Sequence, residues 1–358
     1  MNTFIVDSQA ESRVRSSVGK DKVKVKNKLS IGMIFPGQGS QHLGMCKELY
    51  DEERSIQERF EEASLCLDMN FIRACFASSE KELRDIMVSQ TSIFLVSASI
   101  FSLLKNKYGI EPDLVAGHSL GEYSAIYAAG GMSFVDGLYL LKKRAQIMKE
   151  NMDRQNGGML AVLAFPYEQL RFICDQYNQP ENNISVAEVV NYNSPTQYVV
   201  SGTIPELEEV KRDVEILRGK AIMLPVSGSF HSRLTRMAEQ QFSPYLFKAD
   251  FKKLRVPLVN NMMAQKVSSP AELRLSIVRQ TSSHVLWWQS MQHFRDMDII
   301  IEIGPNDKFA KMLKREWPEK TIVSVNNQED IDNLQRIIKE KEANLVSCAK
   351  KTEDEFTT

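Results

Sequence analysis

A serine between two glycines marks the boundary between an apolar run and a helical stretch in the first half of the chain. Asp113–Gly117 predicts a short buried strand, and Tyr123–Ala129 predicts a helix. Gly117 and Gly121 allow a sharp turn from strand to helix without Cβ clashes. Such a turn points the Ser119 hydroxyl outward, beside the free N–H groups of the first helical turn. The spacing G-x-S-x-G predicts either a nucleophile elbow or an ordinary turn with a capping serine, and alone it favours neither.

Apolar runs and amphipathic stretches alternate along most of the sequence. Further strands are predicted at Ser30–Phe35, Asp298–Gly304 and Lys320–Val325, each separated from the next by helical stretches. Strands separated by helices are typical of an α/β fold with a parallel sheet that helices cover on both faces. The sequence therefore predicts an α/β-hydrolase-like large subdomain.

The stretch from Gly157 to Val226 has a different order of elements. It predicts strand, helix, strand, strand, helix and strand, which is the ferredoxin-like pattern. We expect this small subdomain to meet the main sheet near Ser119. The predicted organisation is a flexible N-terminal tail (1–29), the large catalytic subdomain (30–156 and 227–344), the inserted small subdomain (157–226) and a frayed C-terminal tail (345–358).

Charge and composition exclude several classes of function. The chain has 45 basic and 46 acidic residues, so no general attraction to nucleic acid or to a membrane surface is expected. Five cysteines without a C-x-x-C pair, and five histidines without H-E-x-x-H, predict reduced cytosolic thiols and no metal site. We expect no signal peptide and no apolar span of membrane length, hence a cytoplasmic protein. The basic run Lys20–Lys28 is either a solvated tail or an arm that docks a partner.

A nucleophilic serine needs a general base, and His231 has the best context for that role. It follows a predicted strand end and a Gly/Ser loop, in "SGSFHSRL". Two acidic residues that precede it, Asp213 and Glu215, fall on a helix predicted to be solvated. The sequence therefore favours a Ser–His dyad, oriented by a backbone carbonyl, over a triad with a carboxylate.

Six motifs occur in an order that matches one known family. They are "FPGQGSQ" (35–41), "GHSLGEYSA" (117–125), "KKRAQIM" (142–148), "NYNSPTQYVVSG" (191–202), "SFHSRL" (229–234) and "EIGP" (302–305). Together they resemble the malonyl-CoA:acyl carrier protein transacylases and the acyltransferase domains of polyketide synthases. The resemblance covers about Ser30 to Val325. It implies transfer of a malonyl group from malonyl-CoA to the phosphopantetheine thiol of a holo acyl carrier protein, with no bound cofactor.

The resemblance implies a role for each residue that matches a family motif. Ser119 would carry the malonyl group, and His231 would act as general base. The backbone N–H groups of Gln38 and Leu120 would form the oxyanion hole. Arg144 would bind the malonyl carboxylate, although from the pattern alone it is equally well a solvated charge.

Five more residues receive roles only through the resemblance. His118 and Gln90 match positions that line the acyl pocket, and Asn193 matches a position near the catalytic histidine. Gln90 is equally well a helix-surface glutamine, and Asn193 a turn residue. Phe230 would narrow the pocket against branched acyl groups. The carbonyl of Leu286 would orient the histidine.

Several alternatives stay open at this point. An acyl hydrolase that releases acyl groups from carrier proteins has the same fold, but such relatives tend to lack the arginine at position 144. A non-catalytic scaffold and an ordinary esterase are the other two. The chain contains no ketosynthase or carrier sequence, so we expect a monomer that acts in trans, and "SGSFHSRL" favours polyketide over fatty acid synthesis. Two basic stretches, Lys311–Arg315 and Lys211–Arg212, are candidate docking sites for an acidic carrier protein.

Overall fold

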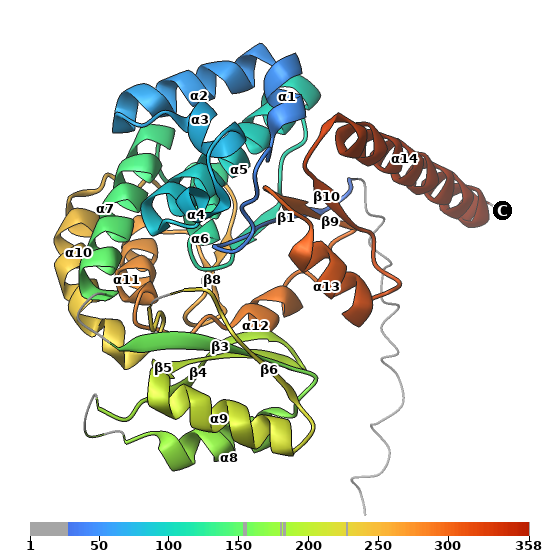
Figure 1. Cartoon of the computed structure of the whole chain (residues 1–358). Coiled ribbons are helices and arrows are strands. Elements are labelled where there is room, and N and C mark those ends of the chain that lie inside the picture. The colour runs from blue at the N-terminus through green and yellow to red at the C-terminus, as the bar shows by residue number, and fades with distance from the viewer. Residues whose placement is uncertain (1–27, 153–155, 180, 182–183, 227, 358) are drawn as a thin grey trace, which may run out of the picture.

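Two sheets organise the molecule (Figure 1). The computed structural model describes residues 28–152, 156–179, 181, 184–226 and 228–357, so the predicted N-terminal tail lies almost wholly outside the described residues. The six-stranded sheet has the order β10-β9-β1-β2-β7-β8, and the four-stranded sheet has the order β4-β5-β3-β6. The fold is therefore of the mixed α/β class that the sequence predicts.

The larger sheet is parallel except at one edge. Its strands are β1 (Ile31–Phe35), β2 (Leu114–Gly117), β7 (Leu258–Val259), β8 (Lys266–Val267), β9 (Ile299–Ile303) and β10 (Ile322–Val325). Only the pairing of β7 with β8 is antiparallel. The four strands predicted for this sheet are confirmed, while the short β7 and β8 were not predicted.

Helices bury both faces of the larger sheet. Ile301 packs into the cluster formed with the first seven helices, whereas its neighbour Ile300 packs into a second cluster with Trp287 and Phe309. This alternation is what a central parallel strand covered on both sides requires. The helices are α1 (Lys47–Glu52), α2 (Arg54–Leu67), α3 (Phe71–Phe76), α4 (Glu80–Leu83), α5 (Ile86–Tyr108), α6 (Gly121–Ala128), α7 (Phe134–Met152), α10 (Arg236–Lys248), α11 (Pro270–Gln280), α12 (Trp287–Gln292), α13 (Lys308–Glu316) and α14 (Gln328–Thr357), with a 3₁₀ turn at Arg233–Thr235.

Helix α5 corrects one expectation. With 23 residues and an apolar composition it is long enough to cross a membrane, contrary to the expectation that no such span exists. Of its most apolar window, 83% is buried inside the protein, and the helix packs against α2, α6 and α7. A helix that is apolar on all sides and surrounded by protein is a core helix.

The smaller sheet carries two helices on one face. Its strands are β3 (Gly157–Leu163), β4 (Ala187–Ser194), β5 (Gln197–Thr203) and β6 (Lys220–Met223), and every pair of neighbouring strands is antiparallel. The two helices are α8 (Tyr167–Tyr177) and α9 (Ile204–Ile216). Figure 1 shows α8 and α9 on the side of this sheet that faces away from the larger one. Edge strand β4 pairs with the segment before α12, where the Val285 N–H donates to Val190 O at 2.8 Å. The small sheet thus joins the large subdomain through this segment, and Met159 and Val199 also pack in one cluster with Met148 of α7.

The C-terminal stretch also differs from the expectation. The predicted frayed tail, 345–358, continues helix α14 as far as Thr357, and Figure 1 shows this helix leaving the body of the molecule. Residues 339–357 contain no glycine or proline, so nothing in the sequence ends the helix there. Ile331 and Leu334 anchor its first turns in the core.

Candidate active site

A tight turn between β2 and α6 positions Ser119. The Ser119 backbone has a positive φ of 52°, which tilts the residue out of both elements. A Cβ added to Gly117 would lie 2.0 Å from the carbonyl carbon of Gly121, and one added to Gly121 would lie 2.3 Å from Phe35 O. The two glycines are therefore required by close backbone approach, while the serine itself adopts the left-handed conformation.

Asn261, which follows β7, holds this turn from the neighbouring strand. Its Oδ1 accepts a hydrogen bond from the Ser119 N–H at 2.6 Å, and its Nδ2 donates to Gly117 O at 2.6 Å. The side chain is 1% exposed. Sequence reasoning missed Asn261, although a polar pair directly after a buried strand is a usable signal at the carboxyl edge of a parallel sheet.

Ser119 and His231 lie within hydrogen-bonding distance. Their Oγ and Nε2 atoms are 2.8 Å apart, and His231 is 4% exposed. The Nδ1 atom of His231 lies 3.0 Å from Gln280 O and 3.1 Å from Ser283 O, which fixes Nδ1 as the protonated nitrogen. Within the described part of the chain both partners of Nδ1 are backbone carbonyls, so the geometry is that of the predicted dyad.

The specific carbonyl predicted for this role was wrong. Leu286 is the N-terminal cap of α12, and its carbonyl accepts the N–H of Ser290 at 2.9 Å. The Ser290 hydroxyl also donates to this carbonyl at 2.9 Å, so both of its lone pairs are engaged within the helix. The carbonyls that orient His231 come from the end of α11 and from the turn that follows it.

Arg144 is the most buried cation of the site. It lies on α7, is 2% exposed, and directs Nη2 to Ser119 Oγ at 3.3 Å. Its Nη1 donates to Gln90 Oε1 at 2.8 Å. None of the described carboxylates forms a contact ion pair with Arg144, and its Nε has no hydrogen-bond partner there; the buried Glu122 acts on it only at longer range. A buried guanidinium without a carboxylate in direct contact is costly to maintain, so the site is suited to an anion supplied by a ligand.

Gln280 links the parts of this site and was not predicted. Its Nε2 donates to Ser119 O at 2.9 Å and to Glu122 Oε2 at 2.7 Å, and its Oε1 lies 3.5 Å from Arg144 Nη2. Burial raises the pKa of Glu122 to about 7, and the hydrogen bond from Gln280 opposes this shift. The glutamine thus binds the Glu122 carboxylate by a hydrogen bond, while Glu122 and Arg144 interact only through their charges.

The remaining predicted residues divide into two groups. Leu120, Gln38, His118 and Phe230 line one cavity together with Ser119. Asn193 Oδ1 lies 2.9 Å from His118 Nε2, and no hydrogen bond between Asn193 and His231 occurs among the described residues. Gln90, fully buried on α5, contacts Arg144, so its interpretation as a helix-surface residue is wrong.

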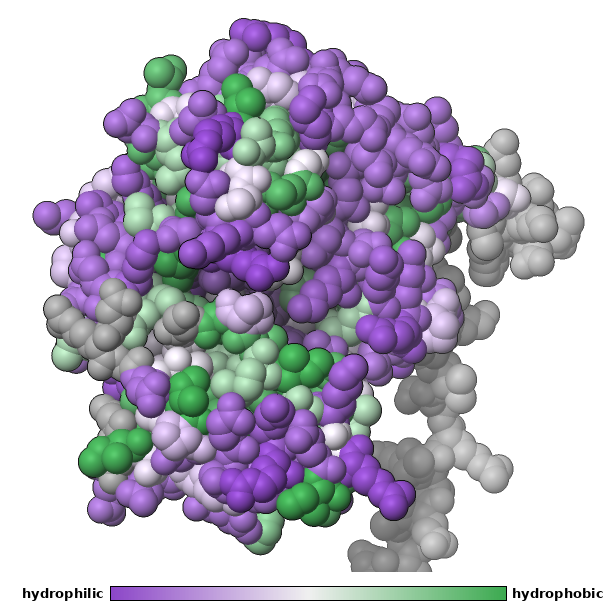
Figure 2. Space-filling view, in the orientation of Figure 1, coloured by the Kyte–Doolittle hydropathy of each residue, from purple (hydrophilic) through white to green (hydrophobic). Residues whose placement is uncertain are grey.

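The cavity that contains Ser119 has a volume of about 360 Å³ and lies between the two sheets. In Figure 2 this boundary is hollowed, and hydrophobic residues gather on its lower side over the four-stranded sheet. Among the described residues that line the cavity are three cations, Arg84, Arg144 and Lys308, and no Asp or Glu. The cavity therefore favours a ligand with negative charge and an apolar segment.

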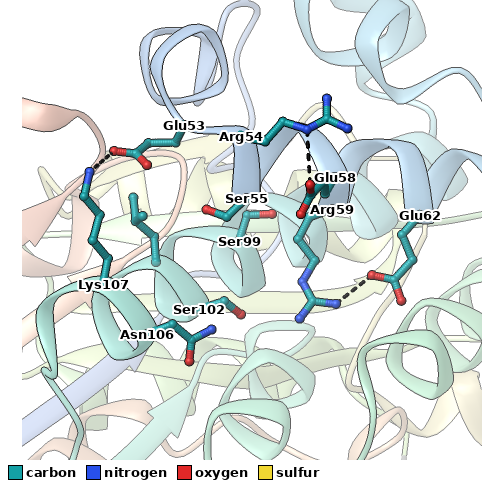
Figure 3. Close-up of a pocket in the computed structure, with 11 residues that line it drawn as sticks. Glu53, Arg54, Ser55, Glu58, Arg59, Glu62, Ser99, Ser102, Asn106 and Lys107 are labelled. Carbon is teal, nitrogen blue, oxygen red and sulfur yellow. Dashed lines mark hydrogen bonds and ion pairs between the residues drawn. The ribbon is translucent and has the colours of Figure 1, made fainter.

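A larger hollow of about 520 Å³ lies between α2 and α5, away from Ser119 (Figure 3). Its charges are matched in pairs. Arg54 Nε lies 3.1 Å from a Glu58 oxygen, Arg59 Nη1 lies 2.6 Å from a Glu62 oxygen, and Lys107 pairs with Glu53. Paired surface charges of this kind are typical of a solvated face, so size alone does not identify the functional cavity.

Burial controls the protonation of the two histidines of the site. Desolvation, reinforced by the charge of Arg144, lowers the pKa of His231 to about 3. Desolvation also lowers the pKa of His118 to about 4, and its ring stacks on Phe309. Both rings are therefore neutral near pH 7, which leaves Nε2 of His231 free to accept a proton from Ser119.

A neutral His231 predicts an unusual pH profile. A base with the ordinary pKa of about 6.5 would lose roughly 30-fold in kcat/KM between pH 7 and pH 5 because it becomes protonated. Since the pKa of His231 is lowered, we expect kcat/KM for acylation to stay nearly constant over that range and to fall only near pH 4 or below. Stopped-flow release of free thiol checks this, and a tenfold fall centred on pH 6.5 would contradict it.

Comparisons with known proteins agree with this geometry. The family model described as "Acyl transferase domain" matches residues 33–358. The malonyl CoA-acyl carrier protein transacylase of Bacillus subtilis is 33% identical over 319 residues, which covers 88% of this chain and 99% of the relative.

Solved structures of malonyl transferases are similar to this chain as well. An acyl-carrier-protein S-malonyltransferase from Burkholderia pseudomallei matches with a TM-score of 0.81 and 32% identity, over 86% of this chain and 100% of that one. A malonyl-transacylase solved in complex with its type II polyketide acyl-carrier protein matches with a TM-score of 0.80 and 29% identity, over 84% and 97%. The resemblance inferred from the six motifs is confirmed: the chain belongs to the acyl transferase domain family and is related to the malonyl CoA-acyl carrier protein transacylases.

Proposed function

We propose that the chain transfers a malonyl group from malonyl-CoA to the phosphopantetheine thiol of an acyl carrier protein. The observation that carries this proposal is Arg144, a buried guanidinium 3.3 Å from the Ser119 hydroxyl that forms no contact ion pair with a carboxylate among the described residues. A malonyl thioester brings a carboxylate to this position, where two parallel charge-assisted hydrogen bonds can form. The names of the related transacylases support the same substrates.

Ser119 would be acylated first. His231 Nε2 takes the hydroxyl proton as Oγ attacks the thioester carbonyl, and the carbonyls of Gln280 and Ser283 stabilise the imidazolium through Nδ1–H. The backbone N–H groups of Leu120 and Gln38 would stabilise the oxyanion. The tetrahedral intermediate then breaks its C–S bond, and the imidazolium returns the proton to the departing thiolate of CoA.

The second half-reaction uses the same groups in reverse. His231 deprotonates the phosphopantetheine thiol, whose sulfur attacks the malonyl-serine ester. The C–O bond to Ser119 breaks, and the imidazolium protonates Oγ. Phe230 lines the cavity and would disfavour α-branched acyl groups by about 1–3 kcal/mol per added methyl.

An acyl hydrolase on the same fold is the alternative, with water in place of the carrier thiol. The presence and burial of Arg144 disfavour it, because release of simple acyl groups needs no buried cation. A non-catalytic scaffold would not need the 2.8 Å contact between Ser119 and His231. An ordinary esterase would need a carboxylate on Nδ1, where two carbonyls stand.

The strand order β4-β5-β3-β6 supports a ferredoxin-like description of the small subdomain, and the turn at Ser119 supports an α/β-hydrolase-like description of the large one. We infer a cytoplasmic place of action from the relationship to these biosynthetic enzymes. Either fatty acid or polyketide carrier proteins fit the chemistry, because both carry the same arm.

The test combines the enzyme with malonyl-CoA and a holo carrier protein, followed by intact mass spectrometry of the carrier. We expect a malonyl-carrier product, and an apo carrier without the arm serves as the control. Release of free malonate without any carrier product would overturn transfer and support the hydrolase.

A further inference from the structure

We propose that the side chain of Asn191 binds the secondary amide nearest to the thioester sulfur, and that this contact selects thioesters carried on a phosphopantetheine arm. The inference rests on the proposed function and adds a residue that recognises the arm itself. Both substrates present the same group, since CoA and a holo carrier protein end in the same cysteamine unit.

The backbone of Asn191 is held by strand pairing on both sides, while its side-chain oxygen has no hydrogen-bond partner among the described residues. It lies on β4, paired with Val199 of β5 on one side and bridged to Val285 on the other. The residue is 7% exposed, and its Oδ1 is buried without a hydrogen-bond partner among the described residues. A buried amide oxygen without a partner costs about 1–3 kcal/mol, so its retention calls for an explanation.

The position of Asn191 supplies that explanation. Asn191 lines the same cavity as Ser119 and His231. Asn193, two residues along the strand, does not line that cavity, and its Oδ1 accepts a hydrogen bond from His118 Nε2. Of these two asparagines, only Asn191 both lines the cavity and has an amide oxygen without a hydrogen-bond partner among the described residues.

The apolar surroundings of Asn191 increase the effect that such a hydrogen bond has on substrate selection. Met148, Met159 and Phe230 line the cavity beside it, so an amide that enters gives up its water there. In the arm, two methylenes separate the sulfur from an amide with one N–H and one C=O. The Asn191 carboxamide offers both a donor and an acceptor, and rotation about its last side-chain bond presents either one. A hydrogen bond from the N–H of the arm to Asn191 Oδ1 satisfies this donor and this acceptor, and it fixes the sulfur relative to Ser119.

The test compares two small thioesters that differ only in this amide. One is the malonyl thioester of N-acetylcysteamine, and the other is the malonyl thioester of 2-acetoxyethanethiol, in which an ester oxygen replaces N–H. The rate of Ser119 acylation is followed by intact mass spectrometry. We expect the wild-type protein to prefer the amide by about 10- to 100-fold. In Asn191→Leu the ratio of the two acylation rates should fall close to one, mainly because acylation by the amide substrate becomes slower.

Asn193→Ala is the matched control. It removes a neighbouring asparagine that contacts His118. The acylation rates with the two substrates should therefore fall by the same factor, and their ratio should keep its wild-type value. If Asn191→Leu does not fold, Asn191→Ser tests the same ratio with a smaller polar side chain. A wild-type ratio near one, or an unchanged ratio in the Asn191 variant, overturns the inference. Failure of the wild-type protein to form any malonyl adduct would instead overturn the proposed function.

Discussion

Ser119→Ala is expected to abolish formation of the malonyl-enzyme and to lower the transfer rate by about 10⁴–10⁶-fold. The reason is geometric, since the Ser119 Oγ is the hydroxyl that lies 2.8 Å from His231 Nε2. The variant should still bind malonyl-CoA, because Arg144 and the rest of the cavity remain. Intact mass spectrometry after mixing with malonyl-CoA, and the initial rate of carrier malonylation, measure the two effects.

Ser124→Ala is the control for this result. Ser124 lies on α6, one turn further along, and its buried Oγ has no hydrogen-bond partner among the described residues. Its loss should leave both the adduct and the rate close to wild type. A malonyl adduct that persists in Ser119→Ala would place the covalent intermediate on another residue and contradict the mechanism.

Arg144→Ala is expected to change which acyl group is accepted. Removing one partner of a buried charge pair costs about 3–5 kcal/mol, so kcat/KM for malonyl-CoA should fall by about 10²–10⁴-fold. Acetyl-CoA has no carboxylate, and its kcat/KM should change far less. Acylation rates with the two thioesters, measured side by side, test the difference.

Two further variants separate charge from position. Arg144→Lys keeps the charge but loses the planar fork, so only part of the malonyl preference should remain. Lys143→Ala removes the adjacent cation, which lies over the rings of Tyr139 and Tyr245 outside the cavity, and should leave the preference intact. Equal losses for malonyl-CoA and acetyl-CoA in Arg144→Ala would show that the arginine is only structural.

The elements with strong local signals could be predicted from the sequence. The apolar runs of β1, β2, β9 and β10, and the alternating order from β3 to β6, depend on patterns within a few residues. The end of α14 was missed, because the helix continues without a breaking residue through the stretch predicted to be a frayed tail.

The candidate site could be predicted only where side chains match a motif. The carbonyls that orient His231 lie 49 and 52 residues away in sequence and carry no side-chain signature. Asn261 and Gln280 contact the turn at Ser119 from 142 and 161 residues away. Contacts of this kind depend on how α11 and β7 pack beside the turn, which no local pattern encodes.

The two residues of the dyad share a backbone property that sets stability against activity. Ser119 and His231 both have positive φ values, 52° and 67°. For residues other than glycine such conformations cost about 1–3 kcal/mol each, and the surrounding packing has to impose them. Glycine at either position would relieve this strain and remove a reacting group. Selection for a more stable fold and selection for turnover therefore act in opposite directions at the same two positions.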